Sequence, residues 1–350
     1  MAHLNSGGGR IQYDGIQALR FVAAFAVLVL HSTFYTHERL NSEVAIYEYG
    51  AAGVRLFFVI SGFVMILSSF DVDKPLLNWK SFAIRRVIRI VPIYWLATAF
   101  KILPLAFGSG MVLHAALDWG FILKSLLFIP SVGMDGTFHP FLGVGWTLNF
   151  EMFFYALFTI TLAFNARPLI FISPILILLS GLSLFKTEAW PDMIRFWADP
   201  IVLDFLAGML LAHATQRGLL LPPVVAWFIL PIGAIYLLVD TPKIGQGLIL
   251  SISFTLAAAA VVAATIAIDS RIGPKFPRWI IFMGAASYSL YLIHPMVSPV
   301  APFVMAKLGL FYPAVAISLS IATAMFVAPF TYKYFEVPVT RWLTKTFRKK

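Results

Sequence analysis

The sequence predicts an all-α integral membrane protein with about ten transmembrane helices. Of its 350 residues, 60% are hydrophobic and 12% are charged, and the mean hydropathy is +0.87. A soluble globular domain has about a quarter of its residues charged. Apolar stretches of about 20 residues, the length that crosses a bilayer, recur along the chain. There is no cysteine, which excludes disulfides and thiolate catalysis.

The predicted spans follow from where these apolar stretches begin and end. A basic segment at 70–87 separates the second stretch from the third, and a long segment at 108–145 separates the third from the fourth. Within it, the apolar run 119–130 is short, so we expect a re-entrant or interfacial helix there. Short connections separate the later spans and carry Arg167, Lys186, Arg217, Lys243 and Arg271. The ten spans are 16–35, 50–69, 88–107, 146–165, 168–185, 196–216, 222–239, 245–268, 279–304 and 311–334.

The distribution of basic residues predicts that the N and C termini are both cytoplasmic. Cytoplasmic connections of membrane proteins carry an excess of Lys and Arg. With this orientation, most basic residues fall in inner connections and the C-terminal tail. The outer connections hold only Arg39, Lys124, Lys186, Arg195, Lys243 and Lys307. Because the basic residues cluster at helix ends rather than on one soluble module, no nucleic-acid partner is expected.

The first predicted span contains two ionisable residues, Arg20 and His31, separated by ten almost wholly apolar residues. Eleven positions on an α-helix turn through about 1100°, so both side chains share one face, about 16 Å apart along the axis. Ionisable groups in a bilayer are costly and indicate a functional site. We expect Arg20 to bind a charged cosubstrate at one membrane surface and His31 to carry out proton chemistry deeper in.

Two further spans place ionisable residues at the predicted depth of His31. Arg55 lies near the outer end of the second span, and Glu151 lies in the outer half of the fourth. A carboxylate beside a histidine orients the imidazole and stabilises its cation, so that the histidine acts as a general base toward a hydroxyl. Alternatively, Arg55 holds Glu151 ionised in a structural ion pair. Asp204, near mid-membrane, serves a substrate pathway or pairs with a buried arginine.

The ninth predicted span carries Tyr288, Tyr291 and His294. We expect these three residues, with Arg55, to bind substrate in an outward-facing cavity. His294 precedes Pro295, where a helix kinks. The alternative for His294 is a packing role at the kinked backbone.

A cluster of arginines precedes the third predicted span and comprises Arg85, Arg86 and Arg89. Arginine suits bidentate contact with phosphate, and Arg85 and Arg89 are four apart and share a helix face. The cluster therefore binds a phosphorylated cytosolic ligand, or it serves only as a topology determinant at the anionic leaflet.

Taken together, these motifs resemble the membrane-bound acyltransferase 3 family. The matching elements occur in the expected order over nearly the whole chain. The opening IQYDGIQALRFVAAFAVLVLH is most similar to members that acylate exopolysaccharides. The elements are Arg20-x10-His31, GVRLFFVISGF (53–63), RRVIRIVPIYW (85–95), WTLNFEMFFY (146–155), SYSLYLIHPM (287–296) and YFEVPVTRWL (334–343).

The resemblance implies one acyltransferase 3 transmembrane domain over 1–350, with its core at 11–343 and without the fused soluble domain that some members carry. It implies a multi-pass protein of the cell inner membrane that uses a cytoplasmic acyl-CoA donor, with acetyl-CoA the expected cosubstrate and no permanently bound cofactor. The acceptor is a hydroxyl of a surface glycan or its lipid-linked precursor. By motif match, His31 is catalytic, and Arg20, Arg85, Arg86 and Arg89 bind the donor.

The resulting hypothesis is an O-acetyltransferase in which Glu151 orients His31 as general base. Arg55, Tyr288 or Tyr291 stabilises the oxyanion, and transfer is direct or passes through an acyl-histidine. No metal site is expected, because the histidines lack ligand spacing. Two alternatives remain at this point: an acyltransferase acting on a lipid or small molecule, and a proton-coupled transporter or flippase that uses Arg20, His31 and Glu151 as a relay.

Overall fold

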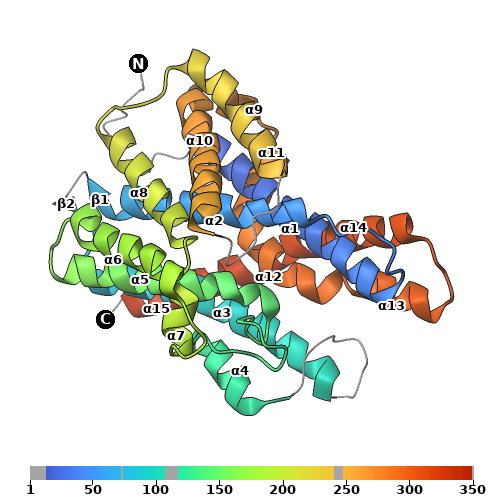
Figure 1. Ribbon diagram of the computed structural model, residues 1–350. Helices are drawn as coiled ribbons and strands as arrows, with labels where there is room; N and C mark the ends of the chain where they lie inside the picture. The colour runs from blue at the N-terminus through green and yellow to red at the C-terminus, as the bar shows by residue number, and fades with distance from the viewer. Residues whose placement is uncertain (1–12, 72–73, 107–116, 240–246, 349–350) are drawn as a thin grey trace.

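The computed structural model describes residues 13–71, 74–106, 117–239 and 247–348. In these residues the structure is almost entirely helical, as predicted (Figure 1). One two-stranded antiparallel hairpin, β1 (Phe70–Asp71) with β2 (Lys74–Pro75), follows the second helix. The predicted start of the domain core, residues 11 and 12, lies outside the described residues.

The helices occur in the predicted order. The α-helices are α1 (Asp14–Arg39), α2 (Ala52–Ser69), α3 (Trp79–Ala106), α4 (Trp119–Leu126), α5 (Trp146–Ala163), α6 (Pro168–Leu182), α7 (Asp192–Trp197), α8 (Val202–Gln216), α9 (Pro223–Val239), α10 (Leu248–Ile272), α11 (Arg278–Ala285), α12 (Ser287–Val297), α13 (Val300–Lys307), α14 (Pro313–Thr331) and α15 (Val337–Arg348). Shorter turns are the 3-10 helices η1 (Glu48–Ala51), η2 (Gly143–Gly145), η3 (Ser183–Phe185) and η4 (Gly273–Lys275), and the π-helical turn η5 (Tyr332–Glu336).

Several of these helices are long and apolar enough to cross a bilayer, so the chain is a multi-pass membrane protein. Within the described residues, six stretches satisfy length and hydropathy together: Asp14–Arg39, Glu48–Ser69, Pro168–Phe185, Leu248–Lys275, Ser287–Lys307 and Pro313–Phe347. Two shorter apolar helices, α8 and α9, add to them. The total of ten spans and the cytoplasmic side of the termini stay predictions.

Two predicted spans are interrupted at prolines. The stretch 196–216 divides into α7 and α8, with Pro200 between them, and Pro299 separates α13 from the rest of 279–304. A further break, between α11 and α12, lies at Ala286 and involves no proline. Proline lacks the N–H that continues a helix and restricts the residue before it. The third span is instead longer than predicted, because α3 begins at Trp79 and carries the whole arginine cluster.

Helix α2 lies at the centre of the molecule and packs against α1, α8 and α10 (Figure 1). Gly62 on α2 and Gly208 on α8 allow the closest of these contacts. A methyl group added to Gly62 would collide with the Phe205 carbonyl, and one added to Gly208 would collide with the Val59 carbonyl. Small residues let membrane helices approach until their backbones touch. Gly62 therefore serves the close packing of α2 against α8.

The core of this helical assembly is rich in phenylalanine. The rings of Phe154 and Phe205 stack with centroids 4.0 Å apart, and Phe58 meets Phe154 edge to face at 6.0 Å. These side chains are at most 4% exposed. Paired aromatic rings contribute about 0.5–1.5 kcal/mol beyond their buried area. They therefore join α2, α5 and α8 into one rigid unit beside the polar site.

Candidate functional site

Two cavities border α1 in the described part of the chain. The first, which we name the arginine pocket, is narrow, with a volume of about 100 Å³. Apolar residues of α2 form much of its wall, so its charged groups lie in a largely apolar environment. Its polar lining consists of Arg20, Ser61, Arg86, Arg89, Thr147, Glu151, Tyr155, Ser287, Tyr288 and Tyr291.

The second cavity, which we name the histidine cavity, has a volume of about 770 Å³. That lies within the range of pockets that enclose a small-molecule ligand, about 300–1,000 Å³. Aromatic and polar side chains alternate around it. They include His31, Phe34, Tyr35, Arg39, Phe100, Lys101, Asp118, Phe121, Asp135, His139, Phe141 and Trp146.

The two cavities lie at successive depths along the same helices. Helix α1 passes from Arg20 in the arginine pocket to His31 in the histidine cavity, and α3 passes from Arg89 to Lys101 in the same sense. Helix α5 runs the opposite way, from Trp146 to Tyr155. The predicted separation of Arg20 and His31 along one helix therefore corresponds to two different chambers.

The arginine pocket gathers opposite charges around Arg89. Glu151 from α5 and Glu336 from η5 both interact electrostatically with Arg89 and with Arg20. Glu336 also accepts a hydrogen bond of 2.5 Å from Ser289 on α12. Three arginines against two carboxylates leave an excess of positive charge in a half-buried site. Such a site can attract an anion.

Arg86 is fixed by neighbours on two helices. Its guanidinium donates to Ser68 Oγ at 2.9 Å, and lies 5.0 Å from the Phe82 ring and 5.4 Å from the Tyr155 ring. Arg85, by contrast, is exposed and is not part of the lining of either cavity. The pair that shares the pocket is therefore Arg86 and Arg89, rather than Arg85 and Arg89 as their spacing predicted.

His31 of the histidine cavity lies against His294, a buried residue of α12 that is not part of the lining of either cavity, although it was expected to bind substrate. The ring centroids are 4.9 Å apart. The Nδ1 of His31 lies 3.0 Å from the Val27 carbonyl, and the Nδ1 of His294 lies 3.0 Å from the Leu290 carbonyl. Each bond spans one turn of the ring's own helix. His294 is fully buried, and its Nε2 has no hydrogen-bond partner among the described residues.

The predicted contact between Glu151 and His31 does not occur. Glu151 lines the arginine pocket and accepts a hydrogen bond from Tyr155, whereas His31 lines the histidine cavity. The prediction placed both residues at one depth. The structure instead places Glu151 at the depth of the arginine pocket, where it faces Tyr155, one turn further along α5. Glu151 is therefore not the group that orients His31.

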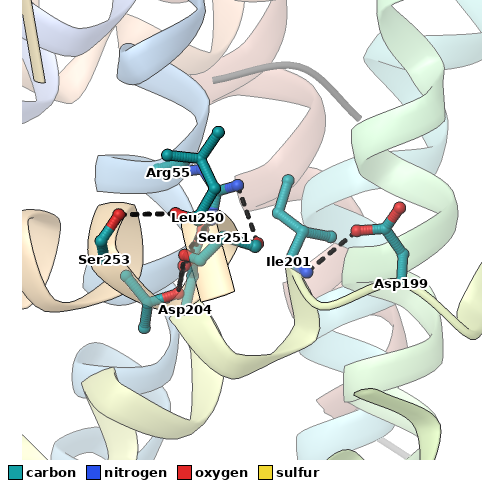
Figure 2. Close-up of polar contacts among 8 residues, drawn as sticks. Arg55, Asp199, Ile201, Asp204, Leu250, Ser251 and Ser253 are labelled. Carbon is teal, nitrogen blue, oxygen red and sulfur yellow. Dashed lines mark hydrogen bonds and ion pairs between the residues drawn. The ribbon is translucent and has the colours of Figure 1, made fainter. Parts of the chain in front are cut away.

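Arg55 pairs with Asp204 rather than with Glu151 (Figure 2). The pair is 3.2 Å apart, and the two side chains are 3% and 0% exposed. Arg55 also donates to Ser251 Oγ at 3.0 Å, and Thr255 donates to Asp204 at 2.5 Å. The network joins α2, α8 and α10, and Arg55 lines neither cavity. Of the roles expected for Asp204, this geometry fits the pairing with a buried arginine, and it gives Arg55 no access to substrate.

Tyr291 lies in the wall between the cavities. Its hydroxyl donates to the Val144 carbonyl at 3.2 Å and accepts from Thr147 at 3.1 Å. Val144 lines the histidine cavity, and Thr147 lines the arginine pocket. Tyr288 lines the arginine pocket too and donates to the Ile90 carbonyl at 2.9 Å. Both tyrosines therefore line the arginine pocket rather than the outward-facing cavity in which they were expected to bind substrate.

At the opposite rim, a short polar motif precedes α5. The backbone N–H and the hydroxyl of Thr137 donate to Asp135 at 3.0 and 2.8 Å. Burial raises the pKa of this carboxyl, but the Thr137 hydrogen bonds outweigh that effect, and the pKa of Asp135 lies below its ordinary value. Asp135 is therefore ionised at neutral pH and can accept hydrogen bonds from hydroxyl groups.

Tyr155 is the pocket residue that the sequence reasoning missed. Its hydroxyl donates to Glu151, and its ring contacts Arg86. The available signal was the spacing of four residues between Glu151 and Tyr155, which places both on one helix face.

Comparison with known proteins gives consistent matches. The acyltransferase domain model of the acyltransferase 3 family matches residues 13–334. Exopolysaccharide production protein ExoZ of Rhizobium meliloti is 32% identical over 295 residues, covering 80% of this chain and 83% of that protein. Acyltransferase MdmB of Streptomyces mycarofaciens is 23% identical over 321 residues, covering 82% and 79%. A longer Staphylococcus aureus protein that bears an O-acetyltransferase name is 26% identical, covering 93% of this chain and 56% of that protein. No solved structure matches the chain.

Proposed function

The chain belongs to the acyltransferase 3 family, and from that premise we propose that it is an inner-membrane O-acetyltransferase that acetylates hydroxyl groups of an exopolysaccharide or its lipid-linked precursor. The observation that carries this proposal is the pair of neighbouring chambers along α1. One chamber is cationic and narrow, and the other is wide and contains His31. The exopolysaccharide acceptor is taken from the name of the R. meliloti relative.

The arginine pocket suits an acyl-CoA donor. Coenzyme A combines phosphate groups with a thin pantetheine arm, and arginine is well suited to phosphate. A volume of about 100 Å³ has room for a thin chain but not for the whole nucleotide. We therefore expect the arm to thread past Arg20 and Arg89, with the phosphates near Arg86 and the exposed Arg85 at the pocket mouth.

The histidine cavity suits a sugar acceptor. A sugar ring has apolar faces and a rim of hydroxyl groups, and this cavity offers aromatic faces such as Tyr35 and Trp146 next to the ionised Asp135. A wide cavity with a few polar groups is a common arrangement for a ligand site. In the proposed orientation, this cavity faces away from the cytoplasm.

The proposed reaction joins the two chambers at Tyr291. The thioester carbonyl passes the Tyr291 wall and meets the acceptor hydroxyl beside His31. His31 Nε2 removes the hydroxyl proton, the oxygen attacks the carbonyl carbon, and the C–S bond breaks. The proton then passes to the departing sulfur, which yields acetylated glycan and free CoA. The Tyr291 hydroxyl, once released from Val144, is a donor for the developing oxyanion.

The test measures transfer of labelled acetyl from acetyl-CoA to purified polysaccharide in detergent, together with CoA binding by calorimetry. For His31→Ala we expect transfer to fall at least about 100-fold, the typical contribution of a general base, with CoA affinity unchanged. For Arg89→Ala we expect CoA affinity to fall about tenfold or more, equivalent to about 1.4 kcal/mol.

The matched control is His213→Ala, which removes a histidine near the end of α8 that lines neither cavity. It should leave both measurements unchanged. Full transfer by a folded His31→Ala protein contradicts the role of His31. Unchanged CoA binding by Arg89→Ala contradicts the donor site. Absence of transfer in wild type, with proton-coupled uptake into vesicles instead, favours the transporter.

A further inference from the structure

Among the described residues, no carboxylate bonds to His31 as one usually does to a histidine base, and a second histidine lies beside it instead. In a serine–histidine–aspartate triad, the carboxylate accepts from Nδ1 and stabilises the imidazolium. Here the Val27 carbonyl accepts from the Nδ1 of His31. The group that faces its ring across the helix interface is His294 of α12, at 4.9 Å between centroids.

The backbone contacts determine the tautomers of both rings. A carbonyl oxygen only accepts hydrogen bonds, so the ring nitrogen bonded to it must carry the hydrogen. In the neutral state, His31 and His294 are therefore both protonated on Nδ1, and each presents a lone pair on Nε2. The ring centroids are 4.9 Å apart with the planes inclined at 56°, and no hydrogen bond joins the rings in the neutral state, since neither Nε2 then carries a hydrogen to donate.

The Nε2 of His294 is a buried acceptor without a donor. It is enclosed by protein and has no partner in the described residues. Leaving a buried polar atom unsatisfied costs about 1–3 kcal/mol. Such an unsatisfied group in a native structure calls for an explanation, and a role in catalysis is one. The adjacent ring can supply one, because His31 acquires an Nε2–H when it takes a proton from the acceptor hydroxyl.

We infer that His294 is a positioning residue for acyl transfer: its Nε2 accepts a hydrogen bond from His31 once His31 is protonated. The inference rests on the proposed function. The hydroxyl proton moves to His31 Nε2, the new C–O bond forms and the C–S bond breaks. The same proton then leaves His31 for the sulfur. Because Nε2 carries a single hydrogen, the bond to His294 forms only as His31 becomes charged and shares that hydrogen with the acceptor oxygen, so it stabilises the charged intermediate more than the ground state.

The surroundings leave this role to His294. Tyr35 lies 6.2 Å from the His31 ring, and Tyr291 lies 6.0 Å from the His294 ring, measured between centroids. His139 is the other titratable group that interacts electrostatically with His31. The charged groups on the same cavity are Arg39, Lys101, Asp118 and Asp135. Two imidazolium ions with ring centroids 4.9 Å apart would repel each other strongly. Only one of the two rings is therefore positively charged at a time.

The kinetic test compares His294→Gln with His294→Phe. A glutamine carbonyl can take the place of the Nε2 acceptor, whereas phenylalanine cannot. We expect kcat to fall about 10- to 100-fold in the phenylalanine variant and to recover partly in the glutamine variant. KM for donor and acceptor should stay within about twofold of wild type, and His213→Gln should match wild type. Wild-type kcat in His294→Phe overturns the inference. So does an equal loss in both variants accompanied by raised KM, because that is the behaviour of a packing residue.

A second measurement does not depend on catalysis. In protein labelled with ¹⁵N-histidine and free of substrates, solid-state NMR should show His31 and His294 as Nδ1–H tautomers, assigned by loss of signals in His31→Ala and His294→Gln. An Nε2–H tautomer at His294 overturns the inference even if acyl transfer is intact. The expected tautomers in a protein that transfers no acyl group instead contradict the proposed function and leave the histidine pair in place.

Discussion

Arg55 carries a charge that the fold itself neutralises, whereas Arg20 and Arg89 face a cavity. All three arginines lie on membrane-spanning or adjoining helices, and the sequence assigned all three to ligand binding. The difference lies in their partners. Arg55 is 3% exposed and bound to Asp204. Arg20 and Arg89 are half-buried and open to the arginine pocket. A buried charge held against an opposite charge indicates structure, and one that faces a cavity indicates function.

The Arg55–Asp204 pair gives the first prediction. In Arg55→Met, Asp204 keeps a buried carboxylate without its cation, and removing one partner of such a pair costs about 3–5 kcal/mol. We expect a clearly lower melting temperature in detergent, with activity lost in proportion to unfolding. The measurement is thermal unfolding followed by tryptophan fluorescence.

The control for this prediction is the double variant Arg55→Met with Asp204→Leu. Replacing a whole buried ion pair by apolar residues is often neutral, so the double variant should regain most of the lost stability. If Arg55→Met melts like wild type but no longer acetylates, Arg55 acts in catalysis, contrary to the geometry of Figure 2.

The next scale is the pairing of helices, where the contact between α2 and α8 gives a second prediction. In Gly208→Ala, the new methyl group meets the Val59 carbonyl, so α2 and α8 must separate. Overpacking of this kind costs about 1–3 kcal/mol. We expect a lower melting temperature and weaker CoA binding, because α2 also forms a wall of the arginine pocket.

The matched control is Gly181→Ala on α6, where the added methyl meets open space. Alanine favours a helix over glycine by up to about 1 kcal/mol, so this variant should be as stable as wild type or slightly more stable. The two substitutions are chemically identical and differ in their surroundings. Equal effects in both would show that the close contact of α2 with α8 contributes nothing.

How far the sequence predicts the elements depends on what ends each helix. Hydropathy located the first span well, because α1 is one unbroken apolar helix from Asp14 to Arg39. It failed where apolar composition continues through a break, as between α11 and α12 near Ala286. It also failed where a helix continues through charged residues, as in α3 from Trp79. The composition of a segment indicates whether it lies in lipid or in water, whereas the backbone geometry determines where its helix begins and ends.

A similar limit applies to the candidate site, because the sequence does not show which residues of neighbouring helices face each other. Motif spacing selected Arg20, Arg89, Glu151 and His31, and the structure places all four on two neighbouring cavities. The expected Glu151–His31 contact was wrong, because Glu151 lies at the depth of the arginine pocket and His31 at the depth of the histidine cavity. The partner found instead, His294, belongs to a helix far along the chain. Only the packing of α1 against α12 brings these two histidines together.

At the scale of the whole molecule, the two cavities define two ends. The arginine pocket lies at the end where α15 follows Glu336 of η5. The histidine cavity lies at the opposite end, next to α7. Gly133 lines this cavity, and the N–H of the adjacent Val132 donates a hydrogen bond to Asp192 of α7. If the donor comes from the cytoplasm, the first end must face it. Charge distribution predicts the same orientation, because the C-terminal tail is basic.

This orientation can be tested directly, because the natural chain contains no cysteine and is already a background for labelling. We expect Glu188→Cys, in the exposed segment just before α7, to react with a membrane-impermeant maleimide in spheroplasts. Thr346→Cys, on the exposed face of α15, should react only after permeabilisation. The cysteine-free parent should give no signal in either condition. Labelling of Thr346→Cys in sealed spheroplasts would place the arginine pocket on the outer side, where acyl-CoA is absent, and would make the donor assignment physically untenable. The observed pattern therefore decides at once the side from which the donor must approach and the direction in which the acyl group moves along α1.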